Sequence, residues 1–369
     1  MNKKFISFLL AINISKYIMI EDKDMELTSI ESLGEFGLID KLTSDIVLKN
    51  TSTIKGVGDD AAVLDYNDKL TLVSTDLLVE NIHFDLVYVP LKHLGYKAAV
   101  VNISDIVAMN GLPKQMTVSI AISSKFSFEA IEEIYSGIKL ACQKYNVDLI
   151  GGDTSASTLG LFISITIIGE AQKDEVVYRN TASKGDLVFV TGNLGAAYMG
   201  LLLLEREKHV FKNDPTMQPD FTGKEYLLER QLKPEAQIEL IQLLKKNNIK
   251  PTAMIDISDG LASEIIHICK QSGVGCNIYE DKIPIDPLTV VTSEEFSILP
   301  VVAALNGGED YELLFTIKQD DYEKIKNLKE YTPIGHITDA DSGINLIGKN
   351  GEQVTIKAQG WDAFKDKDK

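Results

Sequence analysis

Apolar residues recur along the chain with two periods, and from residue 31 onward these periods alternate. Apolar positions spaced three or four apart predict helices over residues 91–109, 128–146, 196–207, 225–232, 234–247 and 261–271. Short runs rich in β-favouring residues predict strands over 70–74, 116–122, 161–168, 187–191 and 254–257. Such an alternation is typical of the α/β or α+β fold class.

The predicted elements fall into two groups. A polar stretch from Gly169 to Asp186 separates them, and 369 residues at about 150 per domain suggest two domains. We therefore expect an N-terminal domain over residues 30–172 and a C-terminal domain over residues 173–369. In the second domain, the polar residues 209–223 predict a surface loop.

The first 24 residues follow a different pattern. A basic start precedes the apolar run 5–12, as in an export signal, but no small-residue cleavage site follows. Two interpretations stay open: residues 1–24 are a non-structural leader with Met25 as the functional start, or they are a genuine export signal. We expect the leader and a cytoplasmic protein, because Cys142, Cys269 and Cys276 form no disulfide framework. No later apolar run reaches the roughly 18 residues that span a bilayer.

Net charge narrows the class of partner. The chain has 37 Lys and Arg against 54 Asp and Glu, a formal charge of −17 at pH 7. Binding to nucleic acid phosphates or to an anionic membrane depends on Lys and Arg, so we expect neither partner. An acidic protein that handles phosphates needs metal ions between its carboxylates and the phosphate oxygens.

In six short segments, including Gly151-Gly152-Asp153, an apolar element is followed by acidic residues in a predicted turn rich in Gly, Ser or Thr. Their acidic residues are Asp59, Asp60, Asp76, Asp105, Asp153, Asp256, Asp259, Glu309, Asp310 and Glu312. Carboxylate oxygens are ligands that Mg²⁺ prefers, and glycine lets a backbone approach phosphate closely. For each segment alone the alternative is structural, since Asp59 or Asp259 can also cap a helix or shape a turn.

Asp105 is the residue that a purely structural interpretation explains least. Its neighbours in the predicted helix are apolar on almost every side, so its carboxylate needs a partner or a metal ion. The chain contains no GxxxxGK[ST] loop, no GxSxG and no HExxH, so a P-loop, a nucleophile elbow and a zinc hydrolase site are not predicted.

Taken together in chain order, the motifs resemble thiamine-monophosphate kinase. They are GVGDDAAV at 56–63, STD at 74–76 with Asn81-x-His83, Lys97 with Asn102-x-Ser104-Asp105, GGDT at 151–154, DISDGL at 256–261 and GGEDYE at 307–312. The similarity runs from about Gly34 to Trp361. Residues 1–24 depart from the family, whose members begin close to the Gly34-Glu35-Phe36 segment.

The resemblance implies a fold and an activity. It implies the two-domain fold of the aminoimidazole ribotide synthetase-like superfamily, with N-terminal sheets that pair into a central barrel in a homodimer. The N-terminal domain then binds ATP and several Mg²⁺ ions. The implied reaction is transfer of a phosphoryl group from ATP to thiamine phosphate, which gives thiamine diphosphate.

The resemblance also implies roles for single residues. The positions that match metal ligands are Asp60, Ser74, Thr75, Asp76, Asp105, Asp153, Asp256 and Asp259. The positions that match nucleotide contacts are Tyr135, Gly152, Asp153, Arg179 and Ser258. The positions that match substrate contacts are His83, Glu309 and Trp361.

The chemistry agrees with these roles. The attacking phosphate oxygen is deprotonated at pH 7, so we expect in-line transfer by positioning and charge neutralisation, without a covalent enzyme intermediate. Two alternatives stay open: a sister enzyme that activates another small molecule with ATP, and a catalytically silent nucleotide-binding dimer. The complete set of acidic residues argues against the silent dimer.

Overall fold

The computed structural model describes residues 53–55, 58–66, 69–214 and 216–360. These residues belong to one compact unit over Val47–Trp361. The predicted leader and the predicted substrate contact Trp361 lie outside the described residues.

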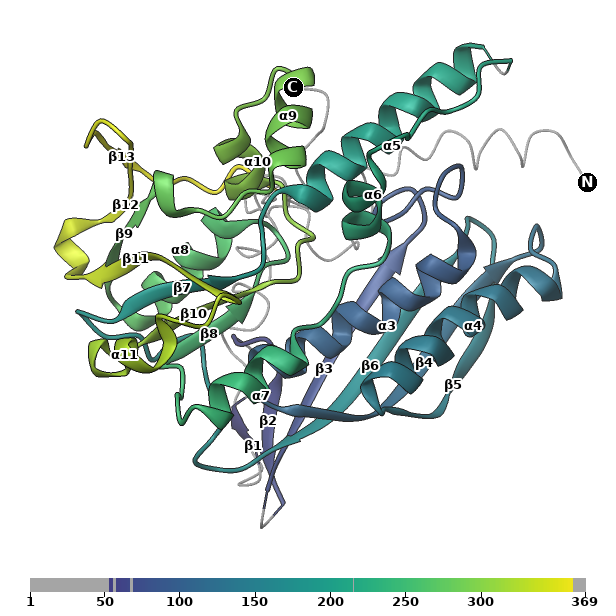
Figure 1. Ribbon diagram of the computed structural model, residues 1–369. Helices are drawn as coiled ribbons and strands as arrows, with labels where there is room; N and C mark the ends of the chain where they lie inside the picture. The colour runs from purple at the N-terminus through teal and green to yellow at the C-terminus, as the bar shows by residue number, and fades with distance from the viewer. Residues whose placement is uncertain (1–52, 56–57, 67–68, 215, 361–369) are drawn as a thin grey trace, which may run out of the picture. The chain divides into compact units, whose positions relative to one another are not determined.

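The first sheet has six strands and two covering helices (Figure 1). Its strands are β1 (Thr53–Lys55), β2 (Ala62–Asp65), β3 (Leu70–Val79), β4 (Leu112–Ser123), β5 (Asp148–Ser157) and β6 (Phe162–Ala171). They pair in the order β1-β2-β3-β6-β4-β5, and all pairs are antiparallel except β4 with β5. The helices α3 (Leu91–Ala108) and α4 (Phe128–Tyr145) pack on one face, and α4 makes the crossover that the parallel β4–β5 pair requires.

Helix α3 is apolar on nearly every side because it is buried on nearly every side. Its residues from Leu94 to Ser104 are all buried, as expected for a helix inside the core. The backbones of α3 and α4 touch where two glycines meet the opposite helix. A Cβ on Gly95 would lie 1.9 Å from the Ile134 carbonyl oxygen, and one on Gly137 would lie 1.9 Å from that of Lys92. Larger residues at 95 or 137 would push the helices apart.

The second sheet has seven strands in the order β13-β12-β9-β11-β7-β10-β8. They are β7 (Leu187–Thr191), β8 (Ala253–Asp256), β9 (Gly275–Tyr279), β10 (Leu313–Ile317), β11 (Tyr331–Thr338), β12 (Ile344–Ile347) and β13 (Gln353–Thr355). The helices of this part are α5 (Ala196–Asn213), α6 (Glu225–Leu232), α7 (Ile238–Lys246), α8 (Leu261–Ser272), α9 (Pro287–Glu295), α10 (Pro300–Asn306) and α11 (Tyr322–Ile325). Short 3₁₀ turns are η2 (Glu280–Lys282), η3 (Gln319–Asp321) and η4 (Ala340–Ser342).

The central strands of the second sheet are buried on both faces. Phe315 of β10 and Phe189 of β7 stack with ring centroids 5.6 Å apart and join the core of the first sheet. Leu314, on the opposite face of β10, packs in a separate core that includes Leu261 and Ile265 of α8. Two-sided burial explains why these strands read as continuous apolar runs rather than as alternating ones.

Most predicted elements are confirmed, and three predictions are wrong in part. The predicted loop 209–223 begins as helix, because α5 continues to Asn213. The residues after position 207 are largely polar, so no apolar stripe revealed them. The pair Gly151-Gly152 lies inside strand β5 rather than in a turn, and β3 continues through Asp76 to Val79, paired with β6 along its full length.

The described part of the first sheet does not close, since β1 and β5 remain its edges. The predicted barrel between two copies therefore stays a prediction. No single helix in the described ranges is long and apolar enough to cross a bilayer, and only the pair α9 and α10, bent by 104°, meets the length and composition together.

Candidate active site

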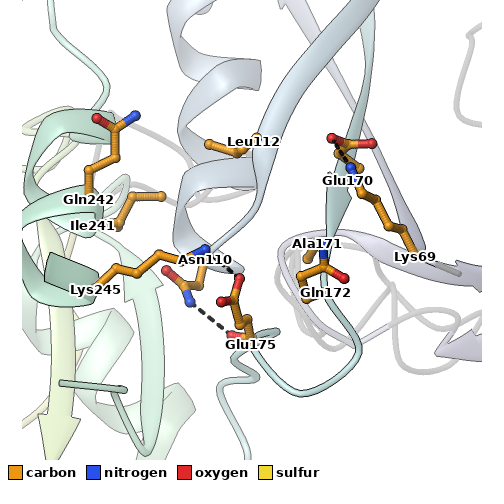
Figure 2. A pocket seen from close by; sticks show the side chains of 10 residues that line it. All are labelled: Lys69, Asn110, Leu112, Glu170, Ala171, Gln172, Glu175, Ile241, Gln242 and Lys245. Carbon is orange, nitrogen blue, oxygen red and sulfur yellow. Dashed lines mark hydrogen bonds and ion pairs between the residues drawn. The ribbon is translucent and has the colours of Figure 1, made fainter. Parts of the chain in front are cut away.

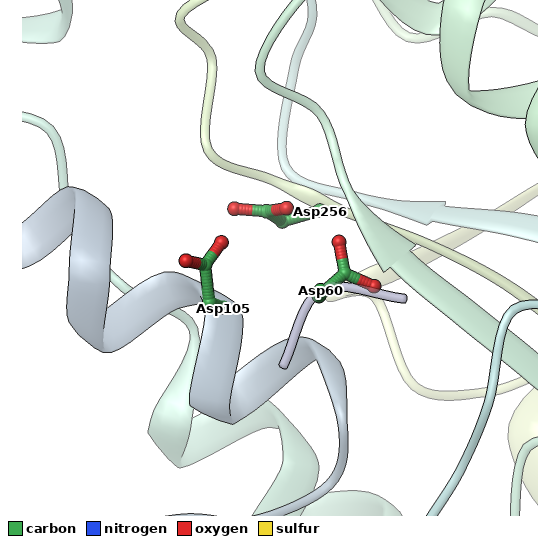
Figure 3. A group of neighbouring side chains, drawn as sticks. All are labelled: Asp60, Asp105 and Asp256. Atoms are coloured by element: carbon green, nitrogen blue, oxygen red, sulfur yellow. The ribbon is translucent and has the colours of Figure 1, made fainter. Parts of the chain in front are cut away.

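Three carboxylates from distant parts of the chain converge at one point (Figure 3). Asp60 precedes β2, Asp105 lies in the last turns of α3, and Asp256 ends β8. Each offers one oxygen, and these three oxygens lie within 4.8 Å of one another. The first two come from the first sheet and its helix, and the third comes from the second sheet. Such spacing suits the coordination of one divalent cation by carboxylates.

The Asn-x-Ser-Asp segment of α3 explains how these elements are held together. Asn102 Oδ1 accepts a hydrogen bond from the Asp76 N–H of β3 at 3.0 Å. Ser104 Oγ donates to Asp256 Oδ2 at 2.5 Å, and Asp105 Oδ2 accepts from Ser74 Oγ at 2.5 Å. One turn of helix thus fixes a strand of each sheet. The sequence predicted no role for Asn102 or Ser104, although both stood in the motif.

Burial and mutual repulsion make the acidic group costly to ionise. Burial, then the charges of Asp76, Asp256 and Asp60, raise the pKa of Asp105 well above its usual range. Burial also raises the pKa of Asp60 and of Asp256, and nearby Arg179 opposes both shifts. A bound cation would remove this penalty, because it favours the charged form of each carboxylate.

Arg179 is the counter-ion of this group in the described protein. Its Nη2 lies 2.5 Å from Asp60 Oδ1, and its Nε lies 3.4 Å from Asp59 Oδ1. The second oxygens of Asp59 and Asp60 are buried and have no hydrogen-bond partner among the described residues. One arginine therefore does not satisfy both aspartates, and the Oδ2 atoms of Asp59 and Asp60 are available to a cation.

Asp76→Asn is expected to change how the stability of the metal-free protein depends on pH. Burial, then repulsion from Asp256, raises the pKa of Asp76 from 3.8 to about 6 in the folded state. The wild type therefore has its full stability relative to the variant below pH 3.8, and it loses this stability as the pH rises through 6. Asparagine has no such charge, so at pH 7 the variant should gain at most about 3 kcal/mol in free energy of unfolding.

Urea unfolding in EDTA across this pH range measures the effect. The difference between the variant and the wild type should vanish near pH 4 and reach its full size near pH 7. A difference that is the same at every pH would contradict the assigned cause.

A cavity of about 160 Å³ lies beside the acidic group. Its lining residues are Asp76, Leu77, Leu78, His83, Lys97, Val101, Asp105, Asp256, Ser258, Glu309 and Tyr311. His83, Lys97 and Glu309 form a second group in this lining. Burial lowers the pKa of His83, the charge of Glu309 opposes this shift, and that of Lys97 adds to it. The cavity thus joins predicted metal ligands to two of the predicted substrate contacts.

Glu309 is fixed by residues that the sequence did not single out as functional. Lys97 Nζ lies 2.7 Å from Glu309 Oε1, and Gln231 Nε2 donates to Glu309 Oε2 at 2.6 Å. Lys97 also donates to the Gln231 carbonyl oxygen at 3.0 Å. Helices α3 and α6 therefore hold one carboxylate from two directions. Lys97 stood in the motif, but Gln231 carried no sequence signal.

The Ser258–Asp259 turn is held by a buried glutamate. Glu264 Oε1 in the first turn of α8 accepts from the backbone N–H of Asp259 at 2.9 Å and from that of Ser258 at 3.3 Å. Ser258 lines the cavity, and Asp259 follows it in the turn between β8 and α8. The turn thus follows Asp256 directly in the chain, and the roles of Ser258 and Asp259 stay predictions.

Four predicted residues lie away from this cavity in the single chain. Thr75 points to the opposite face of β3 from Ser74 and Asp76, and its Oγ1 donates to the Ile165 carbonyl oxygen at 3.0 Å. Gly152 and Asp153 lie on the exposed edge strand β5, and Tyr135 lies half-buried on α4. Position 152 must be glycine, since a Cβ there would lie 1.9 Å from the Val118 carbonyl oxygen.

A second hollow lies at the end of β6, beside α7 (Figure 2). None of the predicted site residues lines it. Its charged groups are paired, with Lys69 Nζ 2.7 Å from Glu170 Oε1 and Lys245 Nζ 2.6 Å from Glu175 Oε2. This hollow offers a ligand no free charge and is best explained as structural.

Comparisons with known proteins agree with the division into two sheets. The family model of the AIR synthase related protein, N-terminal domain, matches residues 58–171, and that of the C-terminal domain matches residues 183–345. Thiamine-monophosphate kinase of Aquifex aeolicus is 34% identical over 335 residues, which are 91% of this chain and 99% of that protein. The chain belongs to the thiamine-monophosphate kinase family.

Solved structures of this family have the same fold. AaThiL complexed with AMPPCP and TMP has a TM-score of 0.78 at 33% identity, over 92% of this chain and 99% of that one. Thiamine-monophosphate kinase from Stenotrophomonas maltophilia K279a has a TM-score of 0.67 at 29% identity, over 87% and 98%. The enzyme of Bacillus subtilis, compared by sequence, is 33% identical over 90% of this chain and all of that protein.

Proposed function

We propose that the chain transfers the γ-phosphoryl group of ATP to thiamine monophosphate and forms thiamine diphosphate. The observation that carries the proposal is the convergence of Asp60, Asp105 and Asp256 beside a cavity that also holds His83 and Glu309. A family neighbour, which is named for its complex with AMPPCP and TMP, supports both substrates.

The acidic group fits magnesium. Its oxygens come from three separate elements, the second oxygen of Asp60 lacks a partner among the described residues, and the carboxylates repel one another. Asp60, Asp105 and Asp256 would hold such an ion, and Asp76 lines the adjoining cavity; Asp259 stays a predicted ligand. When bound, Mg²⁺ neutralises phosphate oxygens and so lowers the repulsion between two anionic substrates.

The residues of the chain position the reactants. The second group of the cavity lining, which contains His83 and Glu309, would bind the organic part of thiamine monophosphate. The phosphate of this substrate would then point toward the acidic group. An acceptor phosphate oxygen forms a bond to the γ-phosphorus while the bond to the β–γ bridging oxygen breaks, and ADP leaves. This acceptor is already ionised at pH 7, so the reaction needs no general base.

The predicted nucleotide contacts support a homodimer. Gly152 and Asp153 occupy an edge strand whose residues from Gly151 to Ala156 are all exposed. The same surface exposes Ile150 at 57%, and Leu159 in the following turn at 87%. Long unpaired edges are normally covered in native proteins, and we propose that a second copy covers this one. Thr75, on the uncovered face of the sheet, would then approach the partner.

Ile150→Lys is expected to convert a dimer of twice 40.7 kDa into a monomer. A charge on the edge strand opposes pairing with a second copy, while the exposed position leaves the single chain intact. Sedimentation velocity measures the mass. Leu299→Lys is the matched control. Leu299 is 68% exposed and lies just before α10, away from this edge strand, so the variant should stay dimeric. A wild-type protein that sediments as an active monomer would contradict the homodimer.

An assay of the purified full chain tests the activity. With ATP, Mg²⁺ and thiamine monophosphate, we expect ADP and thiamine diphosphate in equal amounts. ADP formation only with another acceptor would favour the sister-enzyme alternative. ATP binding without any ADP would favour the silent dimer. The roles of Tyr135, Arg179, Ser258 and Trp361 and the cytoplasmic location stay predictions.

A further inference from the structure

The side chains of the loop 307–312 have two different roles: some support the fold, and others line the cavity. Asp310 and Glu312 are buried supports: Asp310 Oδ2 accepts from the Gly195 N–H at 2.8 Å, and Arg230 Nη1 lies 2.8 Å from Glu312 Oε1. Glu309, which precedes Asp310, and Tyr311, which lies between Asp310 and Glu312, line the cavity instead. The motif predicted a role only for Glu309, so the presence of Tyr311 in the cavity wall needs its own explanation.

The backbone of this loop is held in a conformation that side chains disfavour. Glu309 has φ 58° and Tyr311 has φ 51°, in the left-handed region where a bulky residue is an outlier. Hydrogen bonds on both sides enforce it, with the Tyr311 N–H donating to the Ile257 carbonyl at 2.9 Å and the Glu309 N–H to the Ser258 carbonyl at 2.6 Å. Outliers that the surroundings fix in this way cluster at functional sites.

The strained backbone brings the Tyr311 phenol among carboxylates. Tyr311 lines the same cavity as Glu309, Asp76 and Asp256, so it lies beside both the predicted substrate contact and the acidic group. No hydrogen bond of this hydroxyl is found among the described residues. Its phenol is a hydrogen-bond donor in the wall of a cavity that also contains four carboxylates, Asp76, Asp105, Asp256 and Glu309.

We propose that Tyr311 is a further substrate-binding residue whose hydroxyl donates a hydrogen bond to the phosphate group of the acceptor. This inference rests on the proposed function and deepens it. The acceptor phosphate must lie between the group that binds its organic part and the group that would hold metal, and Tyr311 lies beside both. A phosphate oxygen is a strong acceptor, and the donor needs no reorganisation because the loop already fixes it.

Tyr311→Phe removes only the hydroxyl and keeps the ring. We expect the KM for thiamine monophosphate to rise about tenfold, as for the loss of one hydrogen bond to a charged group, while the KM for ATP stays within about twofold. In equilibrium binding, the variant should lose a similar factor for thiamine monophosphate and none for thiamine, which has no phosphate.

The matched control is Tyr331→Phe, which removes a hydroxyl that donates to the Leu240 carbonyl oxygen. It should lower the thermal midpoint and leave both KM values unchanged. Equal losses for thiamine and thiamine monophosphate in Tyr311→Phe would overturn the phosphate contact, as would unchanged binding in an active, folded variant. A wild type that binds and phosphorylates no thiamine monophosphate would overturn the proposed function itself, and this inference with it.

Discussion

Asp105→Asn is expected to lower turnover about a thousandfold without unfolding the protein. Asparagine has the same shape, and its Oδ1 can still accept the hydrogen bond that Ser74 Oγ gives to Asp105 at 2.5 Å. The change removes a charge at the point where the Asp60 and Asp256 oxygens also converge. A site that neutralises phosphate through bound cations loses most of its effect when one anionic ligand becomes neutral.

Two measurements separate this effect from misfolding. In EDTA, the free energy of unfolding of Asp105→Asn should be no lower than that of the wild type, because repulsion from Asp76 and Asp256 has been removed. Excess Mg²⁺ should raise the thermal midpoint of the wild type and raise that of the variant much less. Asp85→Asn, which breaks a pair with Lys208 outside the acidic group, is the control for charge removal. A folded Asp105→Asn protein with wild-type turnover would refute the assigned role.

Arg230→Met is expected to cost about 3–5 kcal/mol of unfolding free energy. Arg230 Nη1 pairs with Glu312 Oε1 at 2.8 Å, and its Nη2 donates to the carbonyl oxygens of Asn193 at 3.2 Å and Asp310 at 3.1 Å. Methionine fills much of the same volume but leaves the buried carboxylates of Asp310 and Glu312 without their cation. Urea unfolding at pH 8 measures the loss.

The pH dependence of that loss identifies its cause. Burial raises the pKa of Asp310 to about 7 even beside Arg230, and removal of the arginine should raise it further. Protonation then relieves the buried charge in the variant, so part of the loss should be recovered as the pH falls toward 7 and change little below it. Arg206→Met is the matched control, since Arg206 itself is exposed and the loss of its pair with Glu207 should cost less than about 1 kcal/mol. Equal losses in the two variants would contradict the prediction.

Much of the fold could be predicted from local patterns. The helices around Asp105 and over residues 225–232, and the strand 187–191, follow from apolar spacing and flanking Gly and Pro. Local patterns failed where burial did not mark the element. The last residues of α5 are largely polar, and β5 contains two glycines and few apolar residues, so only the ladder with β4 shows it to be a strand.

The candidate site could be predicted as a set of residues but not as a geometry. The motifs named Asp60, Asp105 and Asp256, and the structure brings their oxygens together. They did not show that Thr75 lies on the opposite face of β3, that Arg179 pairs with Asp60, or that Gln231 holds Glu309. Each of these contacts joins residues that are far apart in the chain or depends on which face of a strand a side chain takes.

The sequence by itself determined the types of most predicted elements, the acidic motifs, the family resemblance and therefore the expected chemistry. Only the tertiary structure decided which oxygens share one cavity, which acids are supports, as Asp310 and Glu312 are, and which residue lines the wall, as Tyr311 does. The physical reason is that propensity and periodicity act over a few neighbouring residues. The position of a side chain in space instead follows from strand register and helix packing, which are set by contacts between residues distant in sequence.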